Sequence, residues 1–265
     1  YEFKPRNPQP PTLPEANPVG VYRRDIDIPA DWKERDIYLH LAGAKSGVYV
    51  YINGQEVGYS EDSKNPAEFL INKYVKPGKN VLTLKIFRWS TGSYLECQDF
   101  WRISGIERDV YLYSQPKAAL KDFRITSTLD DSYKNGIFAL NADLCNHRPA
   151  ATNLTLAYEL LDAQGKVVAT EEKTTYVPVN ETRTLSFDKN LTDVRTWTSE
   201  HPNLYKLVMT VKEEGKVNEI IPFNVGFRRI EIKPIDQKAA NGKPYVCLFI
   251  NGQPLKLKGV NIHEH

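Results

Sequence analysis

The chain has 265 residues, of which 41% are hydrophobic and 26% are charged, and its 35 basic and 33 acidic residues leave a net charge of +2. This length predicts about two domains of ordinary globular composition. The balanced charge excludes a strong electrostatic footprint for nucleic acid or an anionic membrane, and no apolar run is long enough to span a bilayer. The three cysteines lie far apart and indicate neither a disulfide framework nor a zinc cluster.

Alternating apolar and polar residues predict β-strands through the first 117 residues. The clearest runs cover residues 21–28, 37–41, 48–52 and 81–87. Such period-two runs, rich in Val, Ile, Tyr and Thr, are typical of half-buried strands. The dipeptide Asn53-Gly54 follows the third run and predicts a hairpin, because both residues tolerate a positive φ. We therefore predict an all-β, jelly-roll-like sandwich here.

The tripeptide Gln115-Pro116-Lys117 is the predicted domain boundary. Strand patterns then recur at the spacing of an immunoglobulin-like sandwich over residues 118–229. They cover residues 122–128, 136–144, 153–161, 167–175, 182–187, 205–211 and 219–227. Two further strands, 245–250 and 254–259, are joined by a second hairpin signal at Asn251-Gly252, and another strand is predicted over 258–265.

The segment 88–102 is dense in aromatic, amide and carboxylate side chains. Aromatic faces stack on sugar rings and carboxylates accept hydrogen bonds from hydroxyls, so this composition suits sugar recognition. A loop packed at a domain interface explains the same composition, and we leave both interpretations open. For Asn53 the first expectation is a role in turn geometry, with ligand contact as the alternative.

Other polar clusters have weaker meaning. Glu61-Asp62 and Asp130-Asp131 are adjacent carboxylates, which point apart in an extended chain, and we predict that they are solvated loop charges. His263 and His265 share a face of an extended chain, but no third zinc ligand is evident. We find no phosphate-binding loop and no nucleophile elbow.

Six ordered motifs nevertheless resemble one family. They cover residues 17–22, 53–69, 88–110, 197–205, 226–228 and 251–265, and the longest, 88–110, contains Trp89-Ser90-x-Gly92-Ser93-Tyr94-Leu95-Glu96-x-Gln98-Asp99-x-Trp101-Arg102. Together they resemble glycoside hydrolase family 2, and within it the bacterial β-galactosidases. The resemblance implies a jelly-roll, galactose-binding-like sugar-binding domain (1–117), an immunoglobulin-like β-sandwich (118–229), and a linker with the first strands of a truncated TIM barrel (230–265).

The resemblance also implies the chemistry. The family's retaining β-galactosidases hydrolyse terminal non-reducing β-D-galactose residues with two Glu residues. Both lie further along the barrel, so we expect no catalytic residue in this chain and no activity from it alone. Asn53, Asp99 and His263 match substrate-binding positions, and Asp99 matches a sodium ligand. The complete enzyme is expected to be a homo-oligomer that uses sodium and magnesium but no organic cofactor. Cys97 and Ile262 depart from the family pattern beside these positions.

Three alternatives remain open from the sequence. A β-glucuronidase-type relative is one, although His265 and the long 89–101 loop favour a galactosidase. A stand-alone carbohydrate-binding module would bind galactosides without an attached enzyme. A purely structural interaction domain would contribute nothing to turnover. The sequence leaves bacterial periplasm and cytoplasm equally open as locations.

Overall fold

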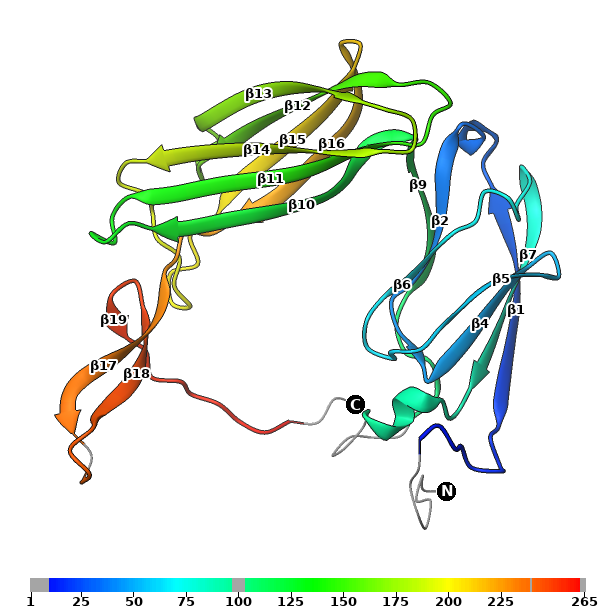
Figure 1. The fold of residues 1–265 in the computed structure, drawn as a ribbon, viewed down its shortest axis with the longest axis horizontal. Helices are drawn as coiled ribbons and strands as arrows, with labels where there is room; N and C mark the ends of the chain where they lie inside the picture. The colour runs from blue at the N-terminus through cyan, green and yellow to red at the C-terminus, as the bar shows by residue number, and fades with distance from the viewer. Residues whose placement is uncertain (1–9, 97–102, 239, 263–265) are drawn as a thin grey trace. The chain divides into compact units, whose positions relative to one another are not determined.

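The computed structural model describes residues 10–96, 103–238 and 240–262. In these ranges the secondary structure is almost wholly β, as predicted, with two short 3-10 helices, η1 (Ala30–Trp32) and η2 (Thr91–Tyr94). The chain forms two compact units, one of residues 1–116 and 260–265 and one of residues 117–259 (Figure 1). Neither described helix has the length and apolarity needed to cross a membrane.

The first unit is a sandwich of two antiparallel sheets. One sheet has the order β1 (Val19–Ile28), β7 (Gly78–Phe87), β4 (Gly47–Ile52), β5 (Gln55–Ser60), and the other β6 (Ala67–Leu70), β2 (Arg35–Leu41), β9 (Val110–Pro116). A small pair joins β3 (Ala44–Lys45) to β8 (Gly105–Ile106). Alternate residues such as Leu39, Val50 and Leu84 are buried between the sheets, because successive strand side chains point to opposite faces.

The second unit contains another sandwich. Its sheets run β10 (Ala118–Leu129), β11 (Gly136–Asn146), β14 (Thr182–Leu191) and β13 (Val167–Val177), β12 (Thr152–Leu161), β15 (Tyr205–Glu213), β16 (Lys216–Val225). Phe138 and Phe187 pack against Tyr158 with ring centroids 5.4 Å apart in each pair. These three aromatic side chains are fully buried and belong to the core of this sandwich.

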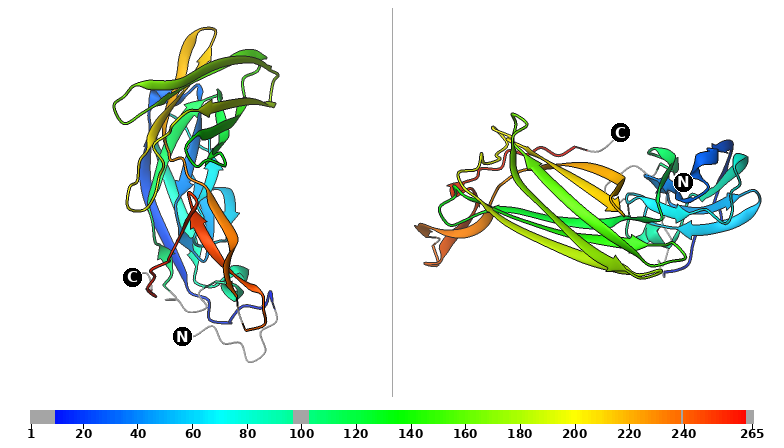
Figure 2. Two further views of the ribbon diagram at one scale, coloured as in Figure 1. Left: turned by 90° about the vertical axis from the view of Figure 1, so that its left-hand side faces the viewer. Right: turned by 90° about the horizontal axis from the view of Figure 1, so that it is seen from above.

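A three-stranded hairpin follows the second sandwich and projects from one end of it (Figure 2). It consists of β17 (Ile230–Lys238), β18 (Pro244–Ile250) and β19 (Gln253–Pro254). The sequence did not indicate β17, which contains Pro234, a residue that argues against a strand interior. Pro234 is accommodated because β17 is an edge strand, paired only with β18.

The strands predicted over 254–259 and 258–265 are wrong for the described residues. After β19 the chain is extended but carries no strand through residue 262. A strand needs a neighbour to take up its backbone hydrogen bonds, and no described strand lies beside residues 256–262. The described residues after β19 therefore form no strand, and the start of a barrel stays a prediction.

Candidate functional site

The Asn53-Gly54 turn joins β4 to β5 with φ angles of 52° and 82°. The amide of Asn53 donates to the Tyr74 carbonyl (3.0 Å) and to Asn80 Oδ1 (2.8 Å), and its Oδ1 accepts from the Val81 amide (3.0 Å). Both amide hydrogens are therefore used inside the sandwich. The structure assigns Asn53 the role of shaping the turn, and its contact with a sugar stays a prediction.

The other two predicted site residues, Asp99 and His263, lie outside the described residues. So do Cys97 and His265, whose identities entered the family comparison. The structure describes the chain up to Glu96 on one side and up to Ile262 on the other, where the Ile262 side chain is exposed. The geometry that supports the candidate site is therefore that of the segment leading into Asp99.

At the start of that segment, hydrogen bonds join the 17–22 motif to the 88–110 motif. The Asn17 amide accepts from the Trp89 backbone N–H at 2.9 Å and donates to the Trp89 carbonyl at 3.0 Å. Trp89 is buried, and the Arg88 guanidinium lies 5.1 Å from the centre of its ring. Residues 72 positions apart are thus joined by a bidentate amide contact, which sequence reasoning missed.

Buried hydroxyls hold the first turn of the segment. Ser46 Oγ lies 2.8 Å from Ser90 Oγ and 3.3 Å from Ser93 Oγ, and Ser93 Oγ accepts from the Ser90 backbone N–H at 3.0 Å. All three serines are less than one-tenth exposed. Because buried polar groups are costly unless they are paired, this network specifies one conformation for η2.

Glu61 corrects one prediction, because it is not a solvated charge. Its carboxylate accepts from Tyr59 Oη (2.5 Å), Thr91 Oγ1 (2.6 Å) and the Gly92 N–H (2.8 Å). Burial acts to raise the pKa of Glu61, but these hydrogen bonds outweigh it and the pKa is lowered. Its burial and the Glu61 carboxylate together raise the pKa of Tyr59. A charged acceptor therefore ties β5 to the 91–96 turn.

Glu96 makes a second tie just before the undescribed residues. Its two oxygens accept from the Ser63 N–H (2.9 Å) and from Ser63 Oγ (2.6 Å). With Lys45 and Arg88 it lines a cavity of about 10 Å³ behind the loop. This volume has room for about one water molecule and none for a sugar.

A larger groove opens along one side of the first sandwich. It has a volume of about 550 Å³, within the range of small-molecule pockets. Its lining combines side chains of the sandwich interior, such as Leu39 and Leu112, with the Tyr22 and Tyr111 rings and with four charged residues of β1, Arg23, Arg24, Asp25 and Asp27. Aromatic and charged groups beside an apolar floor can hold a polar ring.

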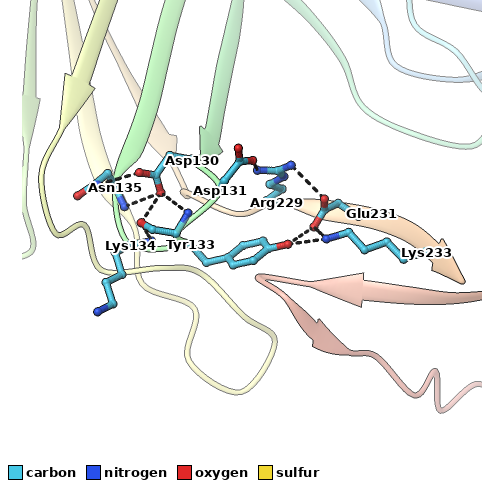
Figure 3. A network of polar contacts seen from close by, with 9 residues as sticks. Asp130, Asp131, Tyr133, Lys134, Asn135, Arg229, Glu231 and Lys233 are labelled. Carbon is cyan, nitrogen blue, oxygen red and sulfur yellow. Dashed lines mark hydrogen bonds and ion pairs between the residues drawn. The ribbon is translucent and has the colours of Figure 1, made fainter. Parts of the chain in front are cut away.

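The second acidic pair also makes side-chain contacts. Asp130 accepts hydrogen bonds from Asn135 (Figure 3) and from Ser132, and these hydrogen bonds lower its pKa from an ordinary 3.8 to about 2. Asp131, although almost fully exposed, pairs with Arg229 at 2.7 Å. The prediction of a solvated loop charge holds for Asp131, which is 97% exposed, whereas Asp130 is held by hydrogen bonds within its loop.

Within residues 10–96, 103–238 and 240–262, no three His, Cys, Asp or Glu side chains gather in a way that could hold a metal ion. Cys145 and Cys247 form no disulfide in the described structure. The sodium and zinc hypotheses concern Asp99, His263 and His265, which fall outside these ranges.

Family models account for most of the chain. Residues 4–116 match the model for the glycosyl hydrolases family 2 sugar binding domain, and residues 118–228 match a second model of glycosyl hydrolases family 2. The chain belongs to glycoside hydrolase family 2. The first family 2 model covers the segment with Asn53 and Asp99, and the second covers the immunoglobulin-like sandwich.

Curated relatives agree with this assignment. The chain is 41% identical to a β-galactosidase of Priestia megaterium, 38% identical to one of Halalkalibacterium halodurans and 34% identical to one of Lactobacillus delbrueckii subsp. bulgaricus. The alignments cover 96–97% of the chain but only 23–24% of each relative. The chain thus spans about a quarter of the length of these relatives.

Solved structures show the same fold. A β-glucuronidase of Bacteroides uniformis superposes with a TM-score of 0.81 at 23% identity over 91% of this chain and 29% of that one. A structure titled putative β-galactosidase of Bacteroides fragilis gives a TM-score of 0.76 at 22% identity, over 89% of this chain and 35% of that one. The TM-scores establish that the fold is shared. Sequence identities of 22–23% are too low to indicate a shared substrate.

Proposed function

We propose that the complete protein is a retaining β-galactosidase that hydrolyses terminal non-reducing β-D-galactose residues. The observation that carries the proposal is the 34–41% identity to β-galactosidases along nearly the whole chain. The β-glucuronidase structures share the fold at only 23% identity, so they support relatedness rather than substrate.

Retaining hydrolysis requires two carboxyl groups about 5–5.5 Å apart, one acting as nucleophile and one as acid and base. We place both outside these 265 residues and infer that this chain contributes positioning groups. Asp99 and His263 would bind galactosyl hydroxyls, and a carboxylate such as Asp99 has the hard oxygen donor that a hard cation such as sodium prefers. Asn53 would have only a remaining lone pair on Oδ1 for a sugar.

The 88–96 segment supports this role for Asp99. Three independent sets of contacts hold the segment in the first sandwich: the Asn17 amide, the buried serine hydroxyls, and the carboxylates of Glu61 and Glu96. A rigid approach reduces the conformational entropy that a hydroxyl-binding residue would lose on binding substrate. The loop-packing alternative is also served by these contacts, so activity measurements must separate the two.

The test uses the complete protein with nitrophenyl β-D-galactoside and nitrophenyl β-D-glucuronide. We expect turnover of the galactoside, and a decrease of about 100-fold or more in kcat/KM for Asp99→Asn. Asp62→Asn is the matched control, because Asp62 is a loop carboxylate of the same sandwich that accepts from Asn65. Preferential turnover of the glucuronide would refute the proposed activity, and equal kcat/KM for Asp99→Asn and the parent protein would refute the role of Asp99.

The groove beside β1 keeps the stand-alone binding module as the alternative. Its aromatic and charged lining is chemically suited to a sugar ring. Calorimetry of the 265-residue chain with galactose and lactose separates the two functions. Millimolar or tighter binding that Tyr111→Ala abolishes would support a binding module, whereas no heat of binding and no hydrolysis by this chain alone is the outcome expected for an enzyme segment.

A further inference from the structure

The β17–β19 hairpin is a small sheet whose apolar face is not covered by another described element. Isolated hairpins are marginally stable in water unless they pack against another element. One face of this hairpin is apolar and open, with Ile230, Ile232 and Val246 between 56% and 74% exposed. In the described structure this face buries little surface, so the hairpin must be held through its other face.

The other face of β17 carries charged side chains that meet a single tyrosine of the neighbouring sandwich. Glu231 and Lys233 alternate with the exposed isoleucines, so their side chains share the opposite face of β17. The Tyr133 hydroxyl donates to Glu231 Oε2 at 2.7 Å and accepts from Lys233 Nζ at 2.6 Å (Figure 3). Its ring centre lies 5.3 Å from that ammonium group and 5.5 Å from the Arg229 guanidinium.

The hairpin turn contacts the same ring. Gly252 has φ +77°, and a Cβ atom added there would lie 2.7 Å from the Tyr133 ring. Glycine is thus required twice, once for its backbone conformation and once for the close approach. The preceding Asn251 accepts from the Arg229 N–H at 2.9 Å and donates to the Trp197 carbonyl at 3.1 Å.

Hydrogen bonds within the 130–135 loop hold Tyr133 in its position. Tyr133 has φ 58°, an uncommon conformation for a bulky residue and one that persists only when its surroundings impose it. The Asp130 carboxylate accepts from Ser132 and Asn135 on either side, and the Asp130 carbonyl accepts from the Tyr133 N–H at 3.1 Å. These contacts fix the loop independently of the hairpin.

We propose that Tyr133 is a positioning residue that docks the β17–β19 hairpin on the immunoglobulin-like sandwich, so that the two open and close as one cooperative unit. Its hydroxyl hydrogen-bonds to Glu231 and Lys233, and its ring lies beside the Arg229 guanidinium. The hairpin turn at Gly252 packs against the same ring. The direction of the chain that follows Gly252 is then set by the sandwich. This inference does not depend on the substrate of the complete enzyme.

Hydrogen exchange of the 265-residue chain tests the docking. Tyr133→Ala should increase the exchange rates of the β17–β18 amides about tenfold or more, while amides of β12 and β15 keep their parent rates. Tyr133→Phe, which keeps the ring and loses the hydroxyl, should lie between the two. Tyr176→Ala is the matched control, because Tyr176 is an exposed tyrosine of β13 in the same sandwich.

A double-mutant cycle makes the test specific to the contact. Gly252→Ala should accelerate hairpin exchange more in the parent chain than in the Tyr133→Ala background, since the backbone strain is common to both but the ring is absent from the second. Unchanged hairpin exchange in Tyr133→Ala would overturn the proposal. Parallel acceleration of β12 and β15 would overturn it as well, because Tyr133 would then be an ordinary packing residue.

Discussion

The two Asn-Gly hairpins have the same turn and opposite surroundings. Asn53-Gly54 and Asn251-Gly252 share nearly the same backbone, with φ values of 52° and 82° in one and 49° and 77° in the other. Nothing lies within 4 Å of a Cβ added to Gly54, whereas the same atom on Gly252 would meet an aromatic ring. The dipeptide therefore determines the turn, and the neighbouring element determines what the turn is used for.

Their asparagines differ in the same way. The Asn53 amide bonds to the Asn80 side chain and to backbone groups of its own sandwich, so it closes that domain on itself. The Asn251 amide bonds to the Trp197 carbonyl, outside the hairpin, and so joins two elements. One turn is internal to a domain and the other is a point of attachment.

The largest expected effect comes from the glycines. Gly54→Ala should destabilise the first unit by about 1–2 kcal/mol, the cost of placing a side chain at positive φ. Gly252→Ala bears the same cost plus about 1–3 kcal/mol for the overlap with Tyr133. Urea unfolding followed separately in each unit by amide exchange measures both values. Equal effects would show that the ring moves aside freely and would remove the distinction between the two turns.

Substitution of the two asparagines should destabilise the protein by an intermediate amount. The loss should fall on the first unit for Asn53 and on the β17–β19 hairpin for Asn251. Asn53→Ala removes three hydrogen bonds, to Tyr74, Asn80 and Val81, and should destabilise the first unit by about 1–3 kcal/mol. Asn251→Ala should accelerate exchange in β17 and β18 and leave the first unit unchanged. The result that contradicts this picture is a loss of first-unit stability in Asn251→Ala.

Acid should produce the smallest effect, confined to the second unit. The folded-state pKa of Asp130 is about 2, below its ordinary 3.8, so its ionised form stabilises the loop above pH 3.8 and this contribution is lost as the pH falls toward 2. Asp130→Asn should therefore lower the Tm of the second unit at about pH 5 and match the parent at about pH 2. The penalty of Asn53→Ala should not change over that range, because its partners are uncharged.

The sequence predicted what depends on local pattern. Strand alternation and the Asn-Gly turns are properties of neighbouring residues, so both sandwiches and both hairpin turns follow from them. The strand at 230–238 escaped prediction because Pro234 argues against a strand unless its edge is free, and edge position is not a local property. The strands expected after residue 254 failed for the converse reason, since an extended pattern without a partner makes no sheet.

Side-chain partners were the least predictable part of the candidate site. Glu61 and Asp131 look alike in sequence, each in a pair of acids, yet one lies among three hydrogen-bond donors and the other reaches an arginine 98 residues away. Asn17 was noted only as part of a motif, although its amide fixes Trp89. Such long-range contacts depend on the register and packing of the strands, which pattern alone does not specify.

The exposed apolar face of the β17–β19 hairpin affects where this chain can be shortened. A chain ended after Gly259 keeps every partner of Tyr133 but displays Ile230, Ile232 and Val246 on a thin edge-bearing sheet, a surface that favours precipitation. A chain ended after Arg229 removes that surface and also removes both hydrogen-bond partners of the Tyr133 hydroxyl. Solubility and local order therefore call for different end points.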